Sequence, residues 1–203
     1  MVVGNLVALQ QHNIKRLLAY SSIGQVGFML MCITAISEQT GSALLLHLVG
    51  YLITNLAIFM AVIAFYNRTG KEEIAEFKGL AQTNPYLALV ITSGLFSLAG
   101  MPLLAGFVTK FILFQSVVSA GYLWLVVVAL VASTVSLYYY LQVIKQMYLY
   151  QPEDDGNGSN ERWSLTVTGY LSTGILFVGV VWVGVYATPF YEFADKAIAP
   201  LFT

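Results

Sequence analysis

Lys110 is the residue in this sequence whose position most clearly indicates a chemical role. It is the only ionic residue in the segment 79–144, and it follows Pro102 by eight residues. A lysine at the centre of a membrane costs roughly 2.5–3.5 kcal/mol on an insertion scale, so such residues are functional by default. Loss of water disfavours the charged amine and an approaching proton or opposite charge restores it, which predicts that Lys110 loads and releases a proton. The alternative is that residues 106–120 form a separate short helix, from which Lys110 extends to a membrane surface.

A second set of polar residues lies four residues apart. His47, Tyr51 and Asn55 therefore share one stripe of a helix. Neutral histidine and tyrosine both donate and accept hydrogen bonds, so the stripe is suited to a proton relay at His47, with Tyr51 and Asn55 in support. Polar side chains at this spacing also hold helices together in lipid. The pattern fits both interpretations.

The segment 85–121 must be interrupted to fit a membrane. About 36 helical residues would extend about 54 Å, whereas the hydrocarbon core is about 30 Å thick. Gly100 and Pro102 mark the break, because proline lacks an amide donor and clashes with the preceding turn. The segment is then either one broken span or two short spans. An unwound turn there would expose free carbonyl groups beside Lys110.

Composition places these residues in a membrane protein. Hydrophobic residues make up 58% of the chain and charged residues 9%, too few for the surface of a soluble domain. The net charge of −1 argues against a nucleic-acid partner, and the single cysteine, Cys32, excludes a disulfide framework or a cysteine metal cluster. Five uncharged runs are each long enough to cross a lipid bilayer: 17–37, 39–67, 79–109, 111–144 and 163–191. The predicted fold is an all-α, polytopic membrane helix bundle.

These runs divide the chain into seven segments. The segments 1–9 and 10–66 are predicted to be the end of a preceding transmembrane helix and a two-helix membrane hairpin. Residues 67–84 form a cytoplasmic loop that is either solvated or contains an interfacial helix with Ile74, Phe77, Leu80 and Ala81 on one face. The other predicted segments are a broken transmembrane helix at 85–121, a transmembrane helix at 122–149, a mobile acidic cytoplasmic loop at 150–162, and a last transmembrane helix with a tail at 163–203.

Charge bias favours five spans, because lysine and arginine collect in cytoplasmic loops. With 85–121 as one broken span, seven basic residues share one side and only Lys196 lies opposite. With two spans there, the division is six against two. The seven residues are Lys15, Arg16, Arg68, Lys71, Lys78, Lys145 and Arg162.

Two further groups are interpreted as structural. The triple tyrosine at 138–140 is typical of an aromatic belt at the cytoplasmic membrane interface. Small and polar residues of the first span, including Ser21 and Gln25, are predicted to make close helix contacts and not a site.

Two motifs resemble a known family. The first is Lys15-Arg16-Leu17-Leu18-Ala19-Tyr20-Ser21-Ser22-Ile23 followed by Gly27-Phe28, and the second is Ser97-Leu98-Ala99-Gly100-Met101-Pro102-Leu103 followed by Gly106-Phe107 and Lys110-Phe111. Together they resemble the antiporter-like membrane subunits of respiratory complex I, most closely the subunit N type of bacterial NADH:quinone oxidoreductase. The likeness covers residues 1–148 well and the remainder weakly.

The resemblance implies a fold and a function. Members of this family have fourteen transmembrane helices with two inverted five-helix repeats, each forming a proton half-channel, and this chain matches the carboxy-terminal part. Lys110 falls on the family's lysine of the broken helix. In the sister subunits L and M the stripe reads histidine, histidine, lysine, so His47 is the member here that titrates near neutral pH. Subunit M has glutamate at the position of Lys110, which favours subunit N.

The resemblance also implies partners and location. The function would be proton translocation coupled to quinone reduction, as a subunit of an enzyme whose NADH, flavin, iron–sulfur clusters and quinone bind elsewhere, with no cofactor on this chain. Partners would be the lipid bilayer, other membrane-arm subunits and a chain supplying helices one to nine. The membrane would be the bacterial inner membrane or an organellar energy-transducing membrane. Alternatives are a subunit of a multisubunit cation/proton antiporter and a purely structural membrane fragment.

Overall fold

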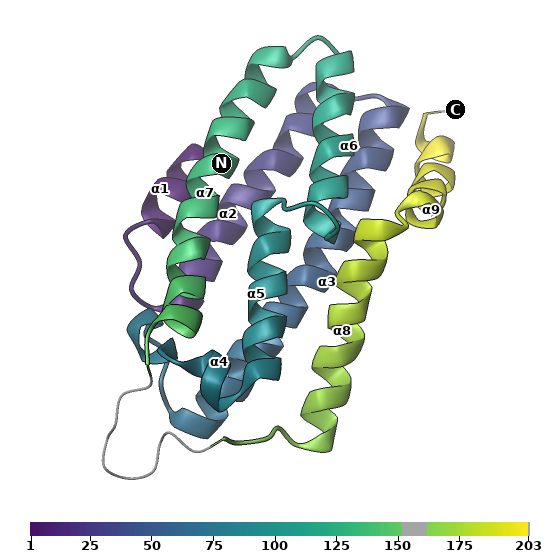
Figure 1. Ribbon diagram of the computed structural model, residues 1–203. Coiled ribbons are helices and arrows are strands. Elements are labelled where there is room, and N and C mark those ends of the chain that lie inside the picture. Colours follow the sequence, from purple (N-terminus) through teal and green to yellow (C-terminus); the bar gives the residue numbers. More distant parts are fainter. Residues whose placement is uncertain (152–161, 203) are drawn as a thin grey trace.

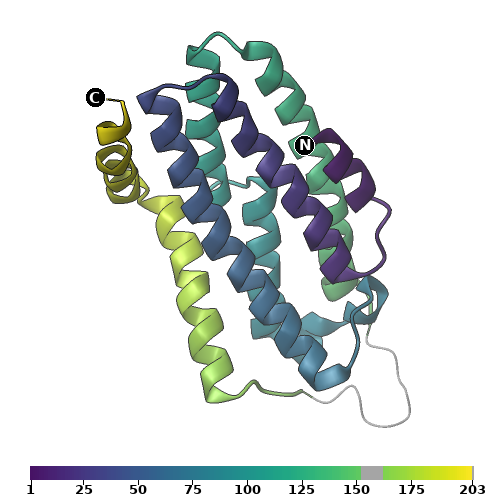
Figure 2. The same ribbon diagram turned by 180° about the vertical axis from the view of Figure 1, so that it is seen from behind.

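The computed structural model describes residues 1–151 and 162–202 and shows a bundle of helices (Figures 1 and 2). Within these residues the regular elements are helical, which confirms the predicted all-α membrane bundle. The longer helices run roughly parallel or antiparallel to one another. Their bounds are α1 Val2–Ala8, α2 Ile14–Thr34, α3 Glu38–Thr69, α4 Leu80–Thr83, α5 Pro85–Ala99, α6 Ala105–Ser119, α7 Leu123–Leu149, α8 Val167–Val185 and α9 Thr188–Ile198.

Local capping signals set the limits of the first two spans. The Asn13 side chain accepts hydrogen bonds from the amides of Lys15 and Arg16, which begins α2. Ser37 and Thr40 form a reciprocal capping box at the start of α3, and Gly70 ends that helix with a φ of +70°. The two helices run antiparallel and form the predicted hairpin (Figure 2).

The helices α5 and α6 together make one interrupted crossing. They run in the same direction and are joined near the middle of the bundle by residues 100–104 (Figure 1). Each has 15 residues and is therefore about 22 Å long, too short to cross a hydrocarbon core of about 30 Å alone. Gly100 has a φ of +90° and Leu103 a φ of +74°, so the chain leaves helical geometry at both ends of the link. The structure thus has the broken helix and not two antiparallel short spans.

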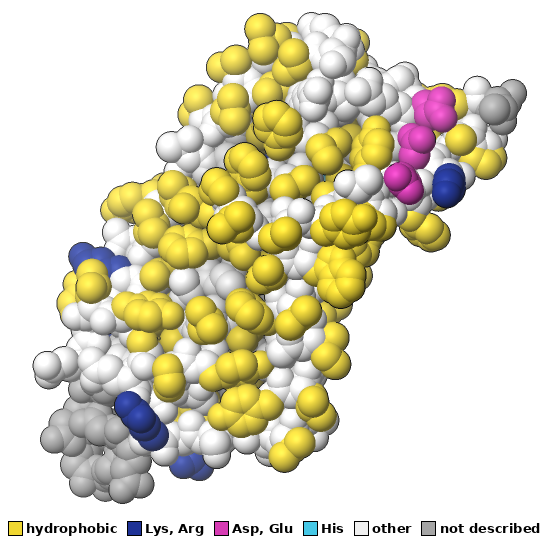
Figure 3. Space-filling model, turned by 45° about the vertical axis from the view of Figure 1, so that its right-hand side comes forward, with side chains coloured by type: hydrophobic (Ala, Val, Ile, Leu, Met, Phe, Trp, Pro, Cys, Tyr) yellow, Lys and Arg dark blue, Asp and Glu magenta, His cyan; other side chains and the backbone are white. Residues whose placement is uncertain are grey.

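The distribution of side chains is that of a membrane protein. Among the described helices, α2, α3, α7 and α8 are individually long and apolar enough to span a membrane. The α5–α6 pair, whose halves run in the same direction, is long enough for one further crossing. The helix α2 begins, and α3 and α7 end, at one end of the bundle (Figure 1). Figure 3 shows lysine and arginine toward that end, an apolar surface between, and acidic side chains with one basic residue toward the other.

The segment between α3 and α5 differs from a single interfacial helix. A 3-10 helix, Ile74–Phe77, and the short α4 are separated at Gly79, which has a φ of +69°. Phe77 is fully buried and stacks on Phe65 with ring centroids 4.1 Å apart. Phe77 and Leu80 thus pack into the protein core, whereas Glu73, Ala75 and Gln82 of the same segment stay exposed.

The tail of the chain forms a helix that packs on the bundle. Nearly all of the predicted acidic loop at 150–162 lies outside the described residues. The expected tail contains α9, which packs against the start of α3, where the Ser42 hydroxyl donates to the Asp195 carboxylate over 2.9 Å. Ala194 is buried in this contact. The tail is thus a docked helix.

Candidate functional site

Lys110 lies buried beside the helix break. Its side chain is 4% exposed, although it carries an ammonium group. The Nζ atom donates to the Leu98 carbonyl over 2.6 Å and to the Ser133 hydroxyl over 3.3 Å. It also lies 5.0 Å from the centre of the Phe28 ring, close enough for a cation–π interaction. Lys110 therefore points into the bundle and does not extend to a membrane surface.

The break supplies the acceptor that holds this ammonium group. In a continuous helix the Leu98 carbonyl would accept from the amide four residues later, but that residue is Pro102, which has no N–H. The Ala99 carbonyl accepts from the Ser133 hydroxyl over 3.2 Å. The carboxyl end of α5 also carries the negative end of the helix dipole, which favours a cation there. Because Pro102 has no amide hydrogen, the carboxyl end of α5 offers a carbonyl group that can bind a cation inside the bundle.

No carboxylate among the described residues pairs with Lys110. Elsewhere in the described part of the chain, an ion pair joins Lys15 to Glu72 over 2.6 Å, at the basic end of the bundle. Both of those side chains are more than a third exposed. The hydrogen bond and charge of Lys15 lower the pKa of the Glu72 carboxyl. Lys110, by contrast, contacts a carbonyl oxygen, a hydroxyl group and an aromatic ring.

His47 contacts the helix that carries Lys110. The ring is 2% exposed, and its Nδ1 atom lies 3.0 Å from the Thr109 hydroxyl, one residue before Lys110. Its Nε2 atom is buried without a hydrogen-bond partner in the described part of the chain. Gly50 permits this approach, because a Cβ atom there would lie 2.8 Å from the Thr109 methyl carbon. The structure therefore places His47 next to the lysine-bearing turn.

The predicted polar stripe is divided. Asn55 donates to the Tyr51 hydroxyl over 3.1 Å, and both side chains are half-buried. His47 instead faces Thr109, and within the described residues it has no hydrogen bond to Tyr51. Tyr51 and Asn55, which are four residues apart, are thus in contact as their helical spacing predicts. The stripe is not one continuous hydrogen-bonded row.

Several side chains around the break were not predicted from the sequence. Ser133 contacts Lys110 from α7, and no spacing in the sequence indicated it. Gln25, interpreted as a packing residue, donates through Nε2 to the Leu98 carbonyl over 3.1 Å. It lies three residues before Phe28, which contacts the ammonium group, but only the structure brings that face of α2 to Lys110.

A polar link fixes the start of α6. The Gly106 amide donates to the Ser97 hydroxyl over 3.0 Å, and that hydroxyl lies 3.0 Å from the Thr54 hydroxyl. A Cβ atom at Gly106 would lie 1.7 Å from the Ser97 carbonyl oxygen, so only glycine fits. The two halves of the broken helix are therefore in backbone contact, four residues before Lys110.

The aromatic-belt interpretation is wrong for two of the three tyrosines. Tyr139 and Tyr140 are 3% and 0% exposed, and only Tyr138 faces outward. The Tyr140 hydroxyl is hydrogen-bonded to the Ser21 hydroxyl, and Tyr139 donates to the Asn5 side chain over 2.8 Å. Consecutive helix residues point about 100° apart, so a triplet cannot lie on one outer face.

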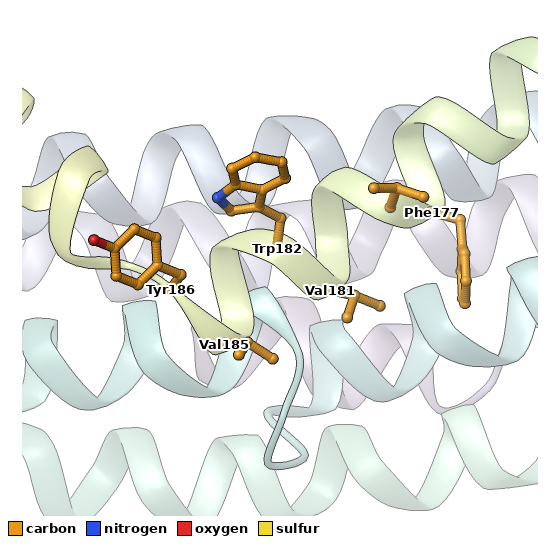
Figure 4. A pocket seen from close by; sticks show the side chains of 6 residues that line it. Phe177, Val181, Trp182, Val185 and Tyr186 are labelled. Atoms are coloured by element: carbon orange, nitrogen blue, oxygen red, sulfur yellow. The ribbon is translucent and has the colours of Figure 1, made fainter.

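Two surface grooves are apolar and lie apart from the lysine. One, of about 470 Å³, follows the outer face of α8 along Phe177, Val181, Trp182, Val185 and Tyr186 (Figure 4). The other, of about 260 Å³, lies between α1 and α7. No group of three metal-ligand side chains occurs among the described residues. The Lys110 site is therefore the candidate for chemistry.

Comparisons with known proteins show the family and the fold of the chain. NADH-quinone oxidoreductase subunit N of Moorella thermoacetica is 47% identical over 154 residues, which cover 76% of this chain and 32% of that protein. A chain of respiratory complex I from Thermus thermophilus superposes with a TM-score of 0.75 at 31% identity, covering 94% of this chain and 42% of that one. A chain of the Mrp complex from Dietzia sp. DQ12-45-1b shares the fold, with a TM-score of 0.89 at 22% identity, covering 99% of this chain and 45% of that one.

This chain spans about a third of the length of the curated relative from Moorella. The family model described as NADH:quinone oxidoreductase/Mrp antiporter, transmembrane, matches residues 1–136, which include the broken helix and Lys110. The chain therefore belongs to the NADH:quinone oxidoreductase/Mrp antiporter transmembrane family.

Proposed function

We propose that this chain is the carboxy-terminal part of a membrane-arm subunit of a proton-translocating NADH:quinone oxidoreductase, and that Lys110 carries protons. The observation behind the proposal is the burial of Lys110 at the break, where a carbonyl freed by Pro102 binds its ammonium group. A buried amine without a carboxylate partner among the described residues can exist in both protonation states. Membership of the family and the 47% identity to a subunit N support the assignment.

The proposal includes a path for the proton. Protonated Lys110 is held by Leu98 and Ser133, and deprotonation weakens both hydrogen bonds because a neutral amine is the poorer donor. His47 on α3 is hydrogen-bonded through Nδ1 to Thr109, the residue before Lys110. Its Nε2 atom, which has no hydrogen-bond partner among the described residues, would accept or release the proton. In this proposal the histidine is a relay, and Tyr51 and Asn55 support α3.

The proposal assigns redox chemistry to other subunits. NADH, flavin, iron–sulfur clusters and quinone would bind elsewhere in the complex, and none would bind this chain. The partners would be other membrane-arm subunits and the helices that complete the longer relatives. The complex would lie in the bacterial inner membrane, with the basic end of the bundle toward the cytoplasm.

A second candidate is a subunit of a cation/proton antiporter. The family description names both kinds of protein, so the fold serves either. Exchange assays separate them. An oxidoreductase subunit is needed for acidification driven by NADH, whereas an antiporter subunit is needed for sodium-driven proton exchange without NADH.

Substitution of Lys110 tests the proposal in the assembled complex that contains this chain. Lys110→Met nearly keeps the length of the side chain and removes its charge. Lys110→Arg keeps a positive charge, because a guanidinium group does not lose its proton in proteins. Both variants should assemble and lose most of their NADH-driven proton transfer in membrane vesicles. Lys145→Met, which removes a surface charge near Tyr150, is the control and should pump normally. Normal pumping by Lys110→Met would refute the carrier role.

A further inference from the structure

Gln25 shares its hydrogen-bond acceptor with the lysine of the site. Its Nε2 atom donates to the Leu98 carbonyl over 3.1 Å, and Lys110 Nζ donates to the same oxygen over 2.6 Å. The glutamine comes from α2 and the lysine from α6, and both side chains are at least 96% buried. A carbonyl oxygen has two lone pairs, so the two donors occupy its full capacity.

The surroundings of Gln25 keep its amide in this position. Phe28, three residues later on the same face of α2, lies under the Lys110 ammonium group. Tyr140 packs from α7, and its hydroxyl interacts with Gln25 and with Ser21. A buried amide that lost its acceptor would carry an unsatisfied donor, so the amide has no favourable alternative position.

The shared acceptor couples the glutamine to the charge of the lysine. The amide hydrogens carry partial positive charge and point at an oxygen that also contacts the ammonium group. In a site where both side chains are buried, that partial charge disfavours the charged lysine and favours release of its proton. When Lys110 loses its proton, its hydrogen bond to the Leu98 carbonyl weakens. Gln25 still donates to that carbonyl, so the oxygen is not left without a hydrogen bond.

We infer that Gln25 is a positioning residue that lowers the proton affinity of Lys110 through the shared Leu98 carbonyl. The inference rests on the proposed carrier role of Lys110. It assigns a task to a residue of α2 that does not itself take up a proton.

Other groups near the lysine do not replace this effect. Among the described elements packed against α6, the buried titratable side chains are His47 on α3, Cys32 on α2, and Tyr139 and Tyr140 on α7. The helices α5 and α8 contribute no buried titratable group in the described residues. None of these buried groups is a carboxylate, so none would strongly favour the charged form of Lys110.

The test compares pH profiles of NADH-driven proton transfer in vesicles containing the whole complex. Gln25→Met matches the glutamine in length and removes the donor, so the alkaline limb should move up by about one pH unit, a tenfold change in proton affinity. Gln25→Glu replaces partial positive charge by negative charge and should move the limb further in the same direction. Gln142→Met is the matched control, because this half-buried glutamine of α7 has no side-chain hydrogen bond in the described part.

The outcomes separate this inference from the proposed function. If Lys110→Met abolishes pumping but both Gln25 variants keep the wild-type profile, the inference is wrong and the carrier role stands. If Lys110→Met pumps normally, the carrier role itself fails. A uniform loss of rate in Gln25→Met, without any shift along the pH axis, would show a merely structural glutamine and also overturn the inference. A shift shared by Gln142→Met would do the same.

Discussion

Gly106→Ala should separate the two halves of the broken helix. The added Cβ atom would lie 1.7 Å from the Ser97 carbonyl oxygen and 2.6 Å from its carbonyl carbon. Carbon–oxygen contacts normally begin near 3.3 Å, so α5 and α6 must move apart by roughly 1.5 Å. Both clashing atoms belong to the backbone, so rotation of a side chain cannot relieve the contact.

The structure sets the size of the effect. Overpacking of this kind costs about 1–3 kcal/mol, and loss of the Gly106 hydrogen bond to Ser97 adds about 1 kcal/mol. Lys110 follows Gly106 by four residues on the same helix face, so its 2.6 Å bond to Leu98 should lengthen with the shift. A displacement of about 1 Å at a reacting group can reduce the rate on the order of 100-fold.

The assay measures the half-time of thermal dissociation of the purified complex together with its NADH-driven proton transfer. Gly169→Ala is the matched control, because the added Cβ atom would meet only the Thr166 and Leu165 side chains at 3.3 and 3.4 Å. Gly106→Ala should dissociate faster and pump far more slowly than this control. If the two variants behave alike, the close contact between the halves does not position Lys110.

Two further predictions concern topology and packing. In a Cys32→Ser background, cysteines at Arg68 and Glu192 should react with an impermeant thiol reagent from opposite sides of the membrane, and labelling from one side would contradict the five crossings. Tyr140→Phe removes a buried hydrogen bond to α2 and should lower the stability of the complex against heat by about 1–3 kcal/mol, whereas the exposed Tyr138→Phe should change it by less than about 0.5 kcal/mol. Equal effects of the two tyrosine variants would show that the buried bond contributes nothing.

The sequence by itself determined the features that depend on local chemistry. Uncharged runs of about 20 or more residues predicted membrane-spanning helices. In lipid a helix satisfies the hydrogen bonds of its own backbone and must carry apolar side chains. Pro102 predicted the break, because a missing amide acts at a fixed distance along the chain. Lys110 was identified because a lone charge in an apolar run is costly wherever the neighbouring helices lie.

The tertiary structure alone decided which side chains meet Lys110. Gln25 and Ser133 lie 85 and 23 residues away from it along the chain, and their contacts depend on how α2 and α7 pack against the break. The burial of Tyr140 likewise depends on Ser21 of another helix. Helix periodicity shows which residues share a face, but not which helix that face will meet. The partners of a buried charge are therefore fixed by packing between distant segments, where an unsatisfied group would be costly.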